Sequence, residues 1–339
     1  MTGFPEKFIK TMRDILKDYK IFDIDPKKLR GKDFYKNMLD YRHFLIGMFE
    51  KSIKTPDQFK CILCNGNNGK EFLAYKNYPL FECQDCGLVS PNIDLNLVDE
   101  EKVYDDKATL EDVRHDVLNN YEYRKNNYGG ERLGYILEKI DLPKEEIKLL
   151  DVGCGTGFFL DHLRGQGVNY KGLELADFLV KICQEKKLNV VKSDLKDESK
   201  AQYNIITLYD VLEHLRDPIG MFKIINDKLM PGGYVLAYTP NIHSLSFVLQ
   251  KERQNNIYAF MHLCFFDKKS LDYLAEKTGF KVYSIDYYGL DVMDYLFMKA
   301  YDDKIDYLAG LKDFISLMQA VIDKQKISNH QRIIFKKIK

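Results

Sequence analysis

Short apolar runs alternate with amphipathic stretches through the second half of the chain. Seven runs have the length and composition of strands, at residues 147–153, 170–175, 189–194, 203–210, 232–240, 280–288 and 331–338. Helical periodicity fills most of the intervals, and strands that alternate with helices form βαβ units around a mostly parallel sheet. We therefore predict an α/β fold with a seven-stranded sheet. Its last strand should be antiparallel and lie beside the run at 280–288.

The first 145 residues do not follow this alternation. Apolar residues at helical spacing predict two helices within residues 5–54. Residues 59–90 combine short apolar runs with clustered Asn and Gly, which is typical of small strands and turns. We expect four parts: a helical extension at 1–56, a small module at 57–92, a helical linker or lid at 93–145, and the α/β domain at 146–339.

Composition narrows the class of protein. Of the 339 residues, 45% are hydrophobic and 30% are charged, which is typical of a globular chain. Lys and Arg total 51, as do Asp and Glu, so a net charge of zero argues against a dedicated nucleic-acid binder. No apolar stretch is long enough for a membrane span, and the first residues lack the apolar core of a secretory signal. We therefore expect a cytoplasmic protein.

Four of the seven cysteines form two Cys-x-x-Cys pairs, Cys61 with Cys64 and Cys83 with Cys86. Two such pairs, here separated by 18 residues, are typical of a tetrahedral zinc site with four thiolate ligands. Because four thiolates fill the coordination shell, the expected Zn²⁺ is structural and not catalytic. Four free thiols or a redox disulfide are the alternatives.

A glycine-rich turn follows the first strand of the α/β domain, in the run LLDVGCGTGFFL at 149–160. Gly153, Gly155 and Gly157 allow positive φ and let a ligand approach the main chain. A P-loop would end in Gly-Lys-Ser/Thr, and a dinucleotide fingerprint would need glycine at Phe158, so neither fits. A loop that binds S-adenosylmethionine carries no pyrophosphate and tolerates this phenylalanine.

Acidic residues stand at the ends of the next strands. Glu174 closes the second strand, where a carboxylate can accept hydrogen bonds from both ribose hydroxyls. Asp194, followed by Leu195, closes the third strand, where it can accept the adenine amino group. Asp151 precedes the glycines and can brace the loop or receive the ligand's amino group. The glycine turn and these three acidic residues all fall at the carboxyl edge of the sheet, where open α/β sheets bind ligands.

The motifs LLDVGCGTGFFL, GLEL, KSDL, YNIITLYDVLEHLRDP and LMPGGYVLAYTPN, in this order, resemble class I S-adenosylmethionine-dependent methyltransferases. The resemblance covers roughly residues 145–290 and implies their seven-stranded Rossmann-like sheet. The FECQDCGLVS segment is similar to a subgroup with an N-terminal zinc module, which includes sugar and polysaccharide-cluster methyltransferases. The core is also similar to ubiquinone-type O-methyltransferases.

The resemblance implies roles for individual residues. Asp151, Gly153, Gly155 and Gly157 would line the methionine part of the cofactor. Glu174 would hold the ribose and Asp194 the adenine, while Tyr209 and Asp210, at the end of the fourth strand, would flank the sulfonium. The implied reaction is methyl transfer to a small molecule. We expect O-methylation of a sugar or polysaccharide precursor, with C- or N-methylation of a nucleotide-activated sugar as the alternative.

An alcohol or an acidic carbon needs a base before it can accept a methyl group. Glu213 and His214 follow the fourth strand, and histidine suits a base near neutral pH. We rank His214 first, His262 second and His243 third. The remaining histidines have no strand-end context and are expected to be structural, namely His43, His115, His162 and His330.

The segment before the sheet and the zinc module leave two further points open. Tyrosines between residues 104 and 128, with Arg124 and Arg132, predict either a packing helix or a lid, with Arg124 near the cofactor's carboxylate or an anionic substrate.

An RNA methyltransferase that uses the zinc module as its RNA reader is a second hypothesis. The neutral charge and the acidic residues Glu82 and Asp85 beside the cysteines speak against it. A third hypothesis is a non-catalytic binding module, and the intact glycine loop argues against it.

Overall fold

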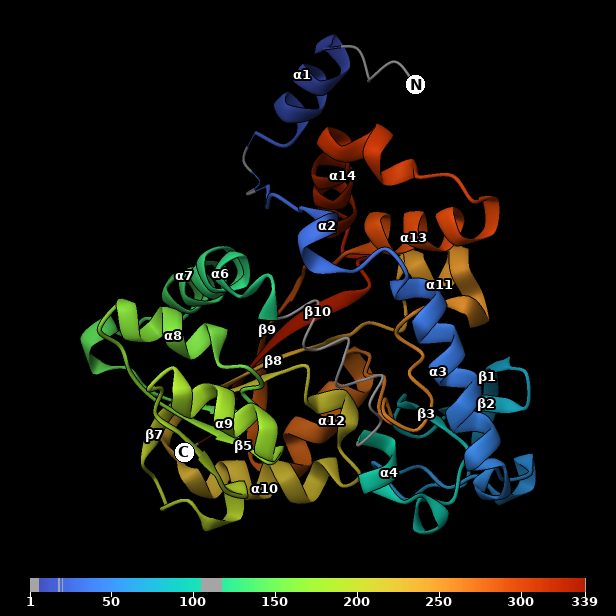
Figure 1. The fold of residues 1–339 in the computed structure, drawn as a ribbon. Coiled ribbons are helices and arrows are strands. Elements are labelled where there is room, and N and C mark those ends of the chain that lie inside the picture. Colours follow the sequence, from blue (N-terminus) through green and yellow to red (C-terminus); the bar gives the residue numbers. More distant parts are fainter. Residues whose placement is uncertain (1–5, 18, 20, 105–117, 339) are drawn as a thin grey trace. The chain divides into compact units, whose positions relative to one another are not determined.

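A computed structural model describes residues 6–17, 19, 21–104 and 118–338. The chain divides by its packing into two compact units. Unit 1 contains Met1–Leu110, Pro240–Lys269 and Asp286–Arg332, and unit 2 contains Glu111–Thr239, Ser270–Ile285 and Ile333–Lys339. Figure 1 follows the chain through both units from blue to red. Within the described residues, every helix is too short or too polar to cross a lipid bilayer.

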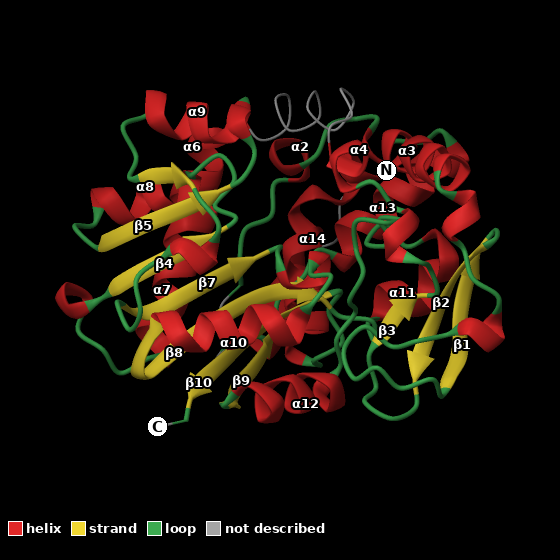
Figure 2. Ribbon diagram, turned by 90° about the horizontal axis from the view of Figure 1, so that it is seen from below, coloured by secondary structure: helices red, strands yellow, loops and turns green. Residues whose placement is uncertain are grey.

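Unit 2 is built on the predicted seven-stranded sheet, in the order β6-β5-β4-β7-β8-β10-β9 (Figure 2). The strands are β4 (Lys148–Val152), β5 (Asn169–Glu174), β6 (Val190–Lys192), β7 (Tyr203–Tyr209), β8 (Leu229–Pro240), β9 (Phe280–Tyr287) and β10 (His330–Lys337). The strands from β4 to β8 pair in parallel. This arrangement places the ends of β4, β5, β6 and β7 at one edge of the sheet.

The last strand runs against its neighbour β8, as predicted. Near the start of β10, Gln331 Nε2 lies 3.5 Å from the carbonyl oxygen of Pro240, the last residue of β8. Near its end, Lys337 Nζ donates to the carbonyl oxygen of Leu229, the first residue of β8, at 2.8 Å. The strand order also places β10 beside β9, so the expected neighbour is confirmed.

Helices pack on both faces of this sheet. They are α7 (Gly130–Lys139), α8 (Phe158–Gly165), α9 (Asp177–Glu185), α10 (Pro218–Lys228) and α12 (Lys268–Thr278). Ile334 of β10 belongs to the buried cluster that contains residues of α7, α8 and α9. The next residue, Phe335, packs against Phe222 of α10, with ring centroids 5.0 Å apart. Successive strand residues point to opposite faces, so this pair of contacts shows that both faces are covered.

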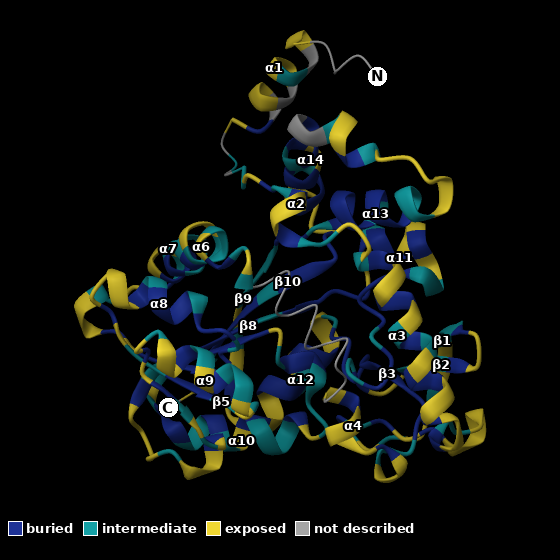
Figure 3. Ribbon diagram, viewed as in Figure 1, coloured by how far each residue is buried: buried dark blue, intermediate teal, exposed yellow. Residues whose placement is uncertain are grey.

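Apolar strands explain why the sheet forms the core of unit 2. Leu150, Ile205, Ile206 and Leu208 are each 0% exposed. Parallel strands covered on both faces need such continuous apolar sequences. Figure 3 shows the central strands in dark blue, with exposed residues on the outer surfaces of the helices. Among the acidic side chains, Asp151, Glu174 and Asp210 stand at or near the carboxyl ends of these strands.

The segment before the sheet is docked on α8 where it is described. Helix α6 (Tyr121–Tyr123), a π-helical turn η5 (Arg124–Gly129) and α7 follow one another without a break. Lys125 Nζ lies 3.2 Å from the carboxylate of Asp161 on α8. A Cβ at Gly129 would lie 2.7 Å from the Cβ of His162, so glycine permits this close approach. The earlier part of the predicted lid, residues 105–117, lies outside the described residues.

Unit 1 combines a small antiparallel sheet with helices. The sheet consists of β1 (Gly69–Tyr75), β2 (Tyr78–Cys83) and β3 (Val89–Pro91). The helices are α1 (Glu6–Ile15), α2 (Pro26–Leu29), α3 (Phe34–Met48), α4 (Glu100–Tyr104), α11 (Leu245–Gln250), α13 (Asp291–Asp303) and α14 (Tyr307–Lys324). The longer N-terminal helices, α1 and α3, correspond to the two that the sequence predicts.

Packing groups the chain differently from its order in sequence. Residues 240–269 and 286–332 belong to unit 1 with the first 110 residues, although they fall within the expected domain at 146–339. One reason is a bridge between Val89 of β3 and Phe265, in which each residue's N–H donates to the other's carbonyl. Such a long-range pairing leaves no local signal in the sequence.

Candidate functional site

The glycine turn after β4 is held open by backbone hydrogen bonds. Gly153, Gly155 and Gly157 have φ values of +68°, +57° and +75°. The N–H groups of Gly153 and Cys154 both donate to the carbonyl of Leu173 on β5, at 2.8 and 3.1 Å. Positive φ values of this kind strain residues that carry a Cβ, and glycine adopts them without strain. The predicted turn is therefore formed by the protein itself, between the ends of two parallel strands.

The glycines of this turn face different surroundings. A Cβ at Gly157 would lie 2.6 Å from Leu188 Cδ1 and 2.9 Å from Cys183 Sγ, so this glycine is required for packing. At Gly155 the corresponding position has no atom within 4 Å. Gly155 is therefore the glycine that leaves space for a ligand to approach the main chain.

Glu174 at the end of β5 contacts the same turn. Its Oε2 accepts a hydrogen bond from the N–H of Gly155 at 2.9 Å. Its Oε1 accepts from the N–H groups of Leu175 and Ala176, at 2.8 and 3.0 Å. Leu175, the residue after Glu174, is 65% exposed. An exposed apolar side chain beside an acid at a strand end can cover one face of an aromatic ligand.

Two further polar side chains lie within the turn. Asp151, at 3% exposed, accepts a hydrogen bond from Thr207 Oγ1 at 2.6 Å. Burial raises the pKa of Asp151 to about 6. The hydroxyl of Thr156 is buried and has no hydrogen-bond partner among the described residues. Because a buried hydroxyl is costly to leave unpaired, Thr156 is a candidate ligand contact that motif reasoning missed.

The third strand ends in a short 3-10 turn. Asp194 caps this turn, Leu195–Asp197, by accepting from the N–H of Lys196 at 3.0 Å. Leu195 is 2% exposed, so its side chain belongs to the interior. The strand pairing of β5 with β6 brings the end of β6 to the same sheet edge as Glu174. The carboxylate of Asp194, whose side chain is 48% exposed, remains accessible at this edge.

The end of β7 carries an aromatic and an acidic residue beside an arginine from α7. The guanidinium carbon of Arg132 lies 3.8 Å from the ring centroid of Tyr209. Arg132 also lies 3.9 Å from the carboxylate of Asp210, which has a φ of +58°. The sequence predicts here either a packing helix or a lid that brings Arg124 near the cofactor's carboxylate or an anionic substrate. The structure places Arg132 at the strand edge, a position set by the docking of α7 and not readable from the sequence.

The turn after β7 contains the first candidates for a catalytic base. Glu213 is 1% exposed, and its Oε2 accepts a hydrogen bond from Thr239 Oγ1 at 3.0 Å. Burial raises the pKa of Glu213 well above its usual range. This carboxyl therefore links the turn to the end of β8. His214 follows it and is half-buried, and its N–H donates to the carbonyl of Val211 at 3.0 Å.

The other two candidates for the base belong to unit 1. His262 is half-buried, and its Nδ1 lies 2.7 Å from the carbonyl oxygen of Asn256. A carbonyl can only accept, so Nδ1 carries the proton of the neutral ring and Nε2 is the basic nitrogen. His243 is exposed, with its ring 6.2 Å from that of Phe72.

The histidines expected to be structural have ordinary packing contacts where they are described. His43 hydrogen-bonds to the hydroxyl of Tyr75, and His162 packs against Gly129. His330 is buried, and burial lowers its pKa to about 3. His115 lies outside the described residues.

The four predicted metal-ligating cysteines come together in unit 1. All four Sγ atoms lie within 4.8 Å of one another, and the pairs Cys61–Cys86 and Cys64–Cys83 are 3.5 Å apart. Zn–S bonds of about 2.3 Å in a tetrahedron would separate the sulfurs by about 3.8 Å. The cluster therefore has the size and ligand type that zinc requires.

The backbone of this cluster also has the turn geometry expected of two zinc knuckles. Gly66 N–H faces Cys64 Sγ at 3.4 Å, and Gly87 has a φ of +84°. A hydrogen bond from Cys86 lowers the pKa of Cys61 to about 6. At least one thiolate is therefore favoured at neutral pH, as metal binding needs deprotonated ligands.

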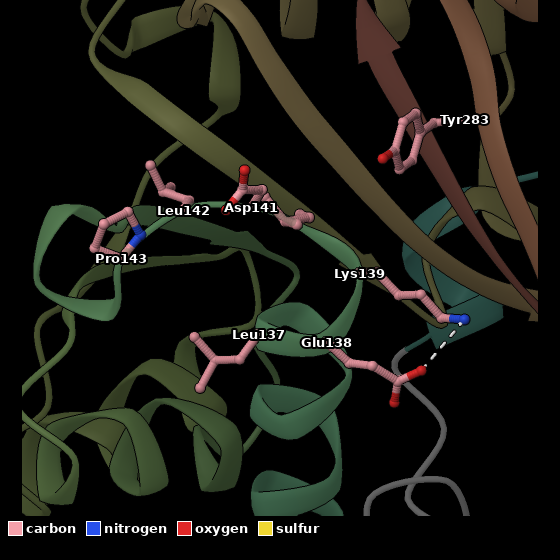
Figure 4. Close-up of a pocket in the computed structure, with 8 residues that line it drawn as sticks. Leu137, Glu138, Lys139, Asp141, Leu142, Pro143 and Tyr283 are labelled. Carbon is pink, nitrogen blue, oxygen red and sulfur yellow. Dashed lines mark ion pairs between the residues drawn. The ribbon is translucent and has the colours of Figure 1, made fainter.

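A surface pocket in unit 2 lies away from these residues. It is lined by residues 137–143 and Tyr283, and Figure 4 shows the Glu138–Lys139 ion pair at its edge. Residues 137–143 lead into the start of β4, at the opposite edge of the sheet from the glycine turn. The pocket contains none of the predicted site residues.

Comparison with known families gives one match within the chain. Residues 121–285 match a family described as a methyltransferase domain. This range begins with α6 and ends within β9, so it includes the glycine turn and the strand-end residues described above.

Curated relatives match a part of the chain only. The chain is 29% identical over 128 residues to a ubiquinone biosynthesis O-methyltransferase from Leptothrix cholodnii, covering 35% of this chain and 54% of the relative. It is 30% identical over 126 residues to the enzyme of the same name from Nitrosospira multiformis, covering 34% and 52%. The chain thus spans about half the length of the curated relatives it matches.

Solved structures resemble the chain more weakly. A crystal structure of a SAM dependent methyltransferase from Archaeoglobus fulgidus matches 66% of this chain and 100% of its own, at 23% identity and a TM-score of 0.46. At a TM-score below 0.5, this likeness supports no inference about the present chain.

Proposed function

We propose, from the premise that residues 121–285 form a class I S-adenosylmethionine-dependent methyltransferase domain, that the chain transfers a methyl group from S-adenosylmethionine to an oxygen of a small molecule. The main observation in support of this proposal is the glycine turn. Gly155 has open space above left-handed backbone, and its N–H is held by Glu174 at 2.9 Å. This is a preformed seat for a ligand at the carboxyl edge of the sheet.

The residues present fit the cofactor's parts. Glu174 would hold the ribose hydroxyls, with Asp194 and the main chain of Leu195 at the adenine. Asp151, Gly153, Gly155 and Gly157 would line the methionine part, together with the unpaired hydroxyl of Thr156. Tyr209 and Asp210 would lie beside the reacting methyl group.

Arg132 completes this set. Its guanidinium lies over Tyr209 at 3.8 Å and within 3.9 Å of Asp210. A planar cation at this place suits a carboxylate, which it can bind through two parallel hydrogen bonds. We therefore assign the methionine carboxylate to Arg132.

The bound cofactor supplies a sulfonium methyl group that needs little further activation. The protein must hold the acceptor in line and, for an alcohol, remove its proton. His214 or His262 would act as that base. Glu213, buried and bonded to Thr239, would serve as a positioning residue for the turn that carries His214.

For the substrate we propose a sugar or a polysaccharide precursor. The similarity to O-methyltransferases of ubiquinone biosynthesis supports oxygen as the acceptor atom. The sugar class rests on the zinc-module subgroup that the FECQDCGLVS segment resembles. Transfer to carbon or nitrogen of a nucleotide-activated sugar is the alternative, and the net charge of zero disfavours RNA.

We also propose one structural Zn²⁺ held by Cys61, Cys64, Cys83 and Cys86. The mutual distances of the four Sγ atoms support it. With four thiolate ligands, the ion has no open position for substrate or water. Its contribution is to the folding of unit 1.

Calorimetry with S-adenosylhomocysteine on the full chain tests the cofactor proposal. We expect one binding site per chain. The change Glu174→Ala should weaken binding by about 1.5–3 kcal/mol, roughly 10–150-fold, because it removes charge-assisted hydrogen bonds. Glu185→Ala, an exposed residue of α9, is the matched control. Absent binding would overturn the cofactor proposal, and equal affinities for the wild type and Glu174→Ala would show that the ligand lies elsewhere.

Transfer of a labelled methyl group to a panel of acceptors then tests the substrate proposal. The panel contains nucleotide sugars, oligosaccharides, a ubiquinone-precursor phenol and total RNA. Label in a sugar oxygen supports the proposal. Label confined to the phenol or to RNA overturns the substrate class and leaves the cofactor site standing.

A further inference from the structure

We infer that the sheet β1–β3 with its four cysteines positions residues 256–267, the segment that carries His262. The inference rests on the zinc site and the base proposed above, and it gives the zinc site a role in substrate handling. Each contact that carries it lies within unit 1.

The first contact is backbone pairing. The N–H of Val89 donates to the carbonyl of Phe265 at 3.1 Å, and the N–H of Phe265 donates to the carbonyl of Val89 at 2.8 Å. Both residues are 0% exposed. Phe265 thus occupies the place of a further strand beside β3, so the position of this part of the segment depends on the small sheet.

The second contact fixes an unusual backbone conformation. Phe260 has a φ of +65°, which is strained for a bulky residue. Its N–H donates to the hydroxyl of Tyr78 on β2 at 3.0 Å, and the two rings lie 5.0 Å apart. Tyr78 is 1% exposed. A strained residue persists only when its surroundings hold it, and Tyr78 supplies that restraint.

The third contact joins the segment's end to the second zinc knuckle. Lys269 Nζ donates to the carbonyl of Gln84, which lies between Cys83 and Cys86, at 2.8 Å. A Cβ at Gly87 would lie 2.9 Å from Asp267 Oδ1, so the knuckle and residue 267 are in close contact. Cys83 ends β2, so the metal ligands continue directly into the strand that carries Tyr78.

The consequence concerns the state of His262. Its Nδ1 is bonded to the carbonyl of Asn256, and its ring lies 6.2 Å from that of Phe265. Both partners belong to the clamped segment. Three strands are about the fewest that form a stable sheet, and a zinc site at the end of β2 would add to the stability of this one. Loss of zinc should therefore release the segment and change the tautomer and environment of His262.

Hydrogen exchange on the full chain, read by mass spectrometry, provides the test. In Cys64→Ser/Cys83→Ser, we expect metal analysis to show lost zinc and the peptides covering 258–266 to exchange at least about tenfold faster. Peptides covering β4 in unit 2 should not change. Lost zinc with unchanged exchange at 258–266 overturns the inference and leaves the zinc proposal intact. A wild-type chain purified without zinc overturns the zinc proposal itself.

A milder variant separates positioning from general unfolding. Tyr78→Phe removes only the hydroxyl that accepts from Phe260, so zinc content should stay at one per chain. We expect faster exchange at the Phe260 amide and a shift of the His262 imidazole resonance, assigned by its loss in His262→Gln. Glu71→Gln, an exposed change on β1, should alter neither signal. An unmoved His262 resonance in Tyr78→Phe would contradict the inference.

Discussion

The two units hold their polar groups in different places. Unit 2 has an apolar sheet at its centre, and acidic residues stand at or near the carboxyl ends of its strands, some exposed, as Asp210 is, and some buried, as Asp151 is. Unit 1 buries carboxyl groups in its interior: Asp291, Asp294 and Asp323 are 3%, 1% and 7% exposed. A site on the edge of an apolar sheet can change without unfolding its support. A polar interior cannot, because each buried group depends on its partners.

The buried acids of unit 1 form one connected network. Asp323 Oδ1 accepts from Ser328 Oγ, Gln319 Nε2 and the N–H of Gly289, at 2.5, 2.9 and 3.1 Å. Gln319 Nε2 also donates to Asp291 Oδ2 at 3.0 Å. Asn329, just before β10, donates from its N–H to Asp291 Oδ2 and from Nδ2 to Asp294 Oδ2, both at 2.8 Å. The network therefore joins the start of α13, the end of α14 and the start of β10, and it adds directional bonds to the apolar packing of unit 1.

The largest effect should come from removing the metal ligands of unit 1. In Cys61→Ser/Cys83→Ser, zinc should fall from about one equivalent to near zero. Zinc sites of this kind contribute about 10 kcal/mol or more to folding, which approaches the whole stability of a typical domain. Metal analysis and thermal unfolding measure both effects. Cys264→Ser, a buried cysteine of unit 1 outside the cluster, should keep its zinc. Zinc retained by the double variant would remove this site from consideration.

A change in the glycine turn of unit 2 should abolish ligand binding and leave the fold. In Gly155→Val, the new side chain enters the open space above the turn, so affinity for S-adenosylhomocysteine should drop at least about 100-fold. The positive φ adds roughly 1–2 kcal/mol of strain, which unit 2 can absorb. Gly157→Val, whose Cβ meets Leu188 and Cys183, should unfold the unit instead. Calorimetry measures the ligand affinity of Gly155→Val, and circular dichroism measures the unfolding of Gly157→Val. Full affinity in Gly155→Val would contradict the proposed role of Gly155 in ligand binding.

The two residues proposed as the base, His214 of unit 2 and His262 of unit 1, provide a further test of the comparison between the units. General base catalysis contributes roughly 10²–10⁴-fold, so removing the base should lower turnover at least about 10²-fold with cofactor affinity intact. We expect this for His214→Ala, with a rate that follows a group titrating between about pH 6 and 8. If His262→Ala shows the loss and His214→Ala does not, the base belongs to unit 1. Full turnover in both would indicate an acceptor that needs no enzymic base.

The smallest effect concerns the acid network of unit 1. Burial raises the pKa of Asp323 from 3.8 to about 7 in the folded chain. Between these values the unfolded chain loses a proton that the folded chain keeps, so stability falls as pH rises. Asp323→Asn cannot ionise, and its amide oxygen can accept the same three hydrogen bonds. Relative to the wild type, it should gain about 2 kcal/mol between pH 5.5 and pH 8.

Urea unfolding at the two pH values measures this gain. Asp14→Asn, an exposed change on α1, should show no such gain. A difference between Asp323→Asn and wild type that does not vary with pH would mean that Asp323 is ionised in the folded chain.

Local sequence determined the parts of this protein that depend on neighbouring residues. The seven strands follow from apolar runs of the right length. The glycine turn follows from three glycines directly after a buried strand, and the cysteine cluster follows from the spacing of two Cys-x-x-Cys pairs. In each case the chemistry lies within a few residues, so that pattern and spacing suffice.

Only the tertiary structure decided which distant residues contact these local features. It placed Arg132 at the strand edge, left open space at Gly155, packed Gly157 against Leu188 and Cys183, and buried Glu213 against Thr239. It also joined residues 240–269 to the sheet β1–β3 beside the four cysteines, through Tyr78 and Val89. These choices depend on which side chains meet across long stretches of chain. That outcome is set by the burial of whole surfaces and by hydrogen bonds between distant strands, for which the local pattern carries no signal.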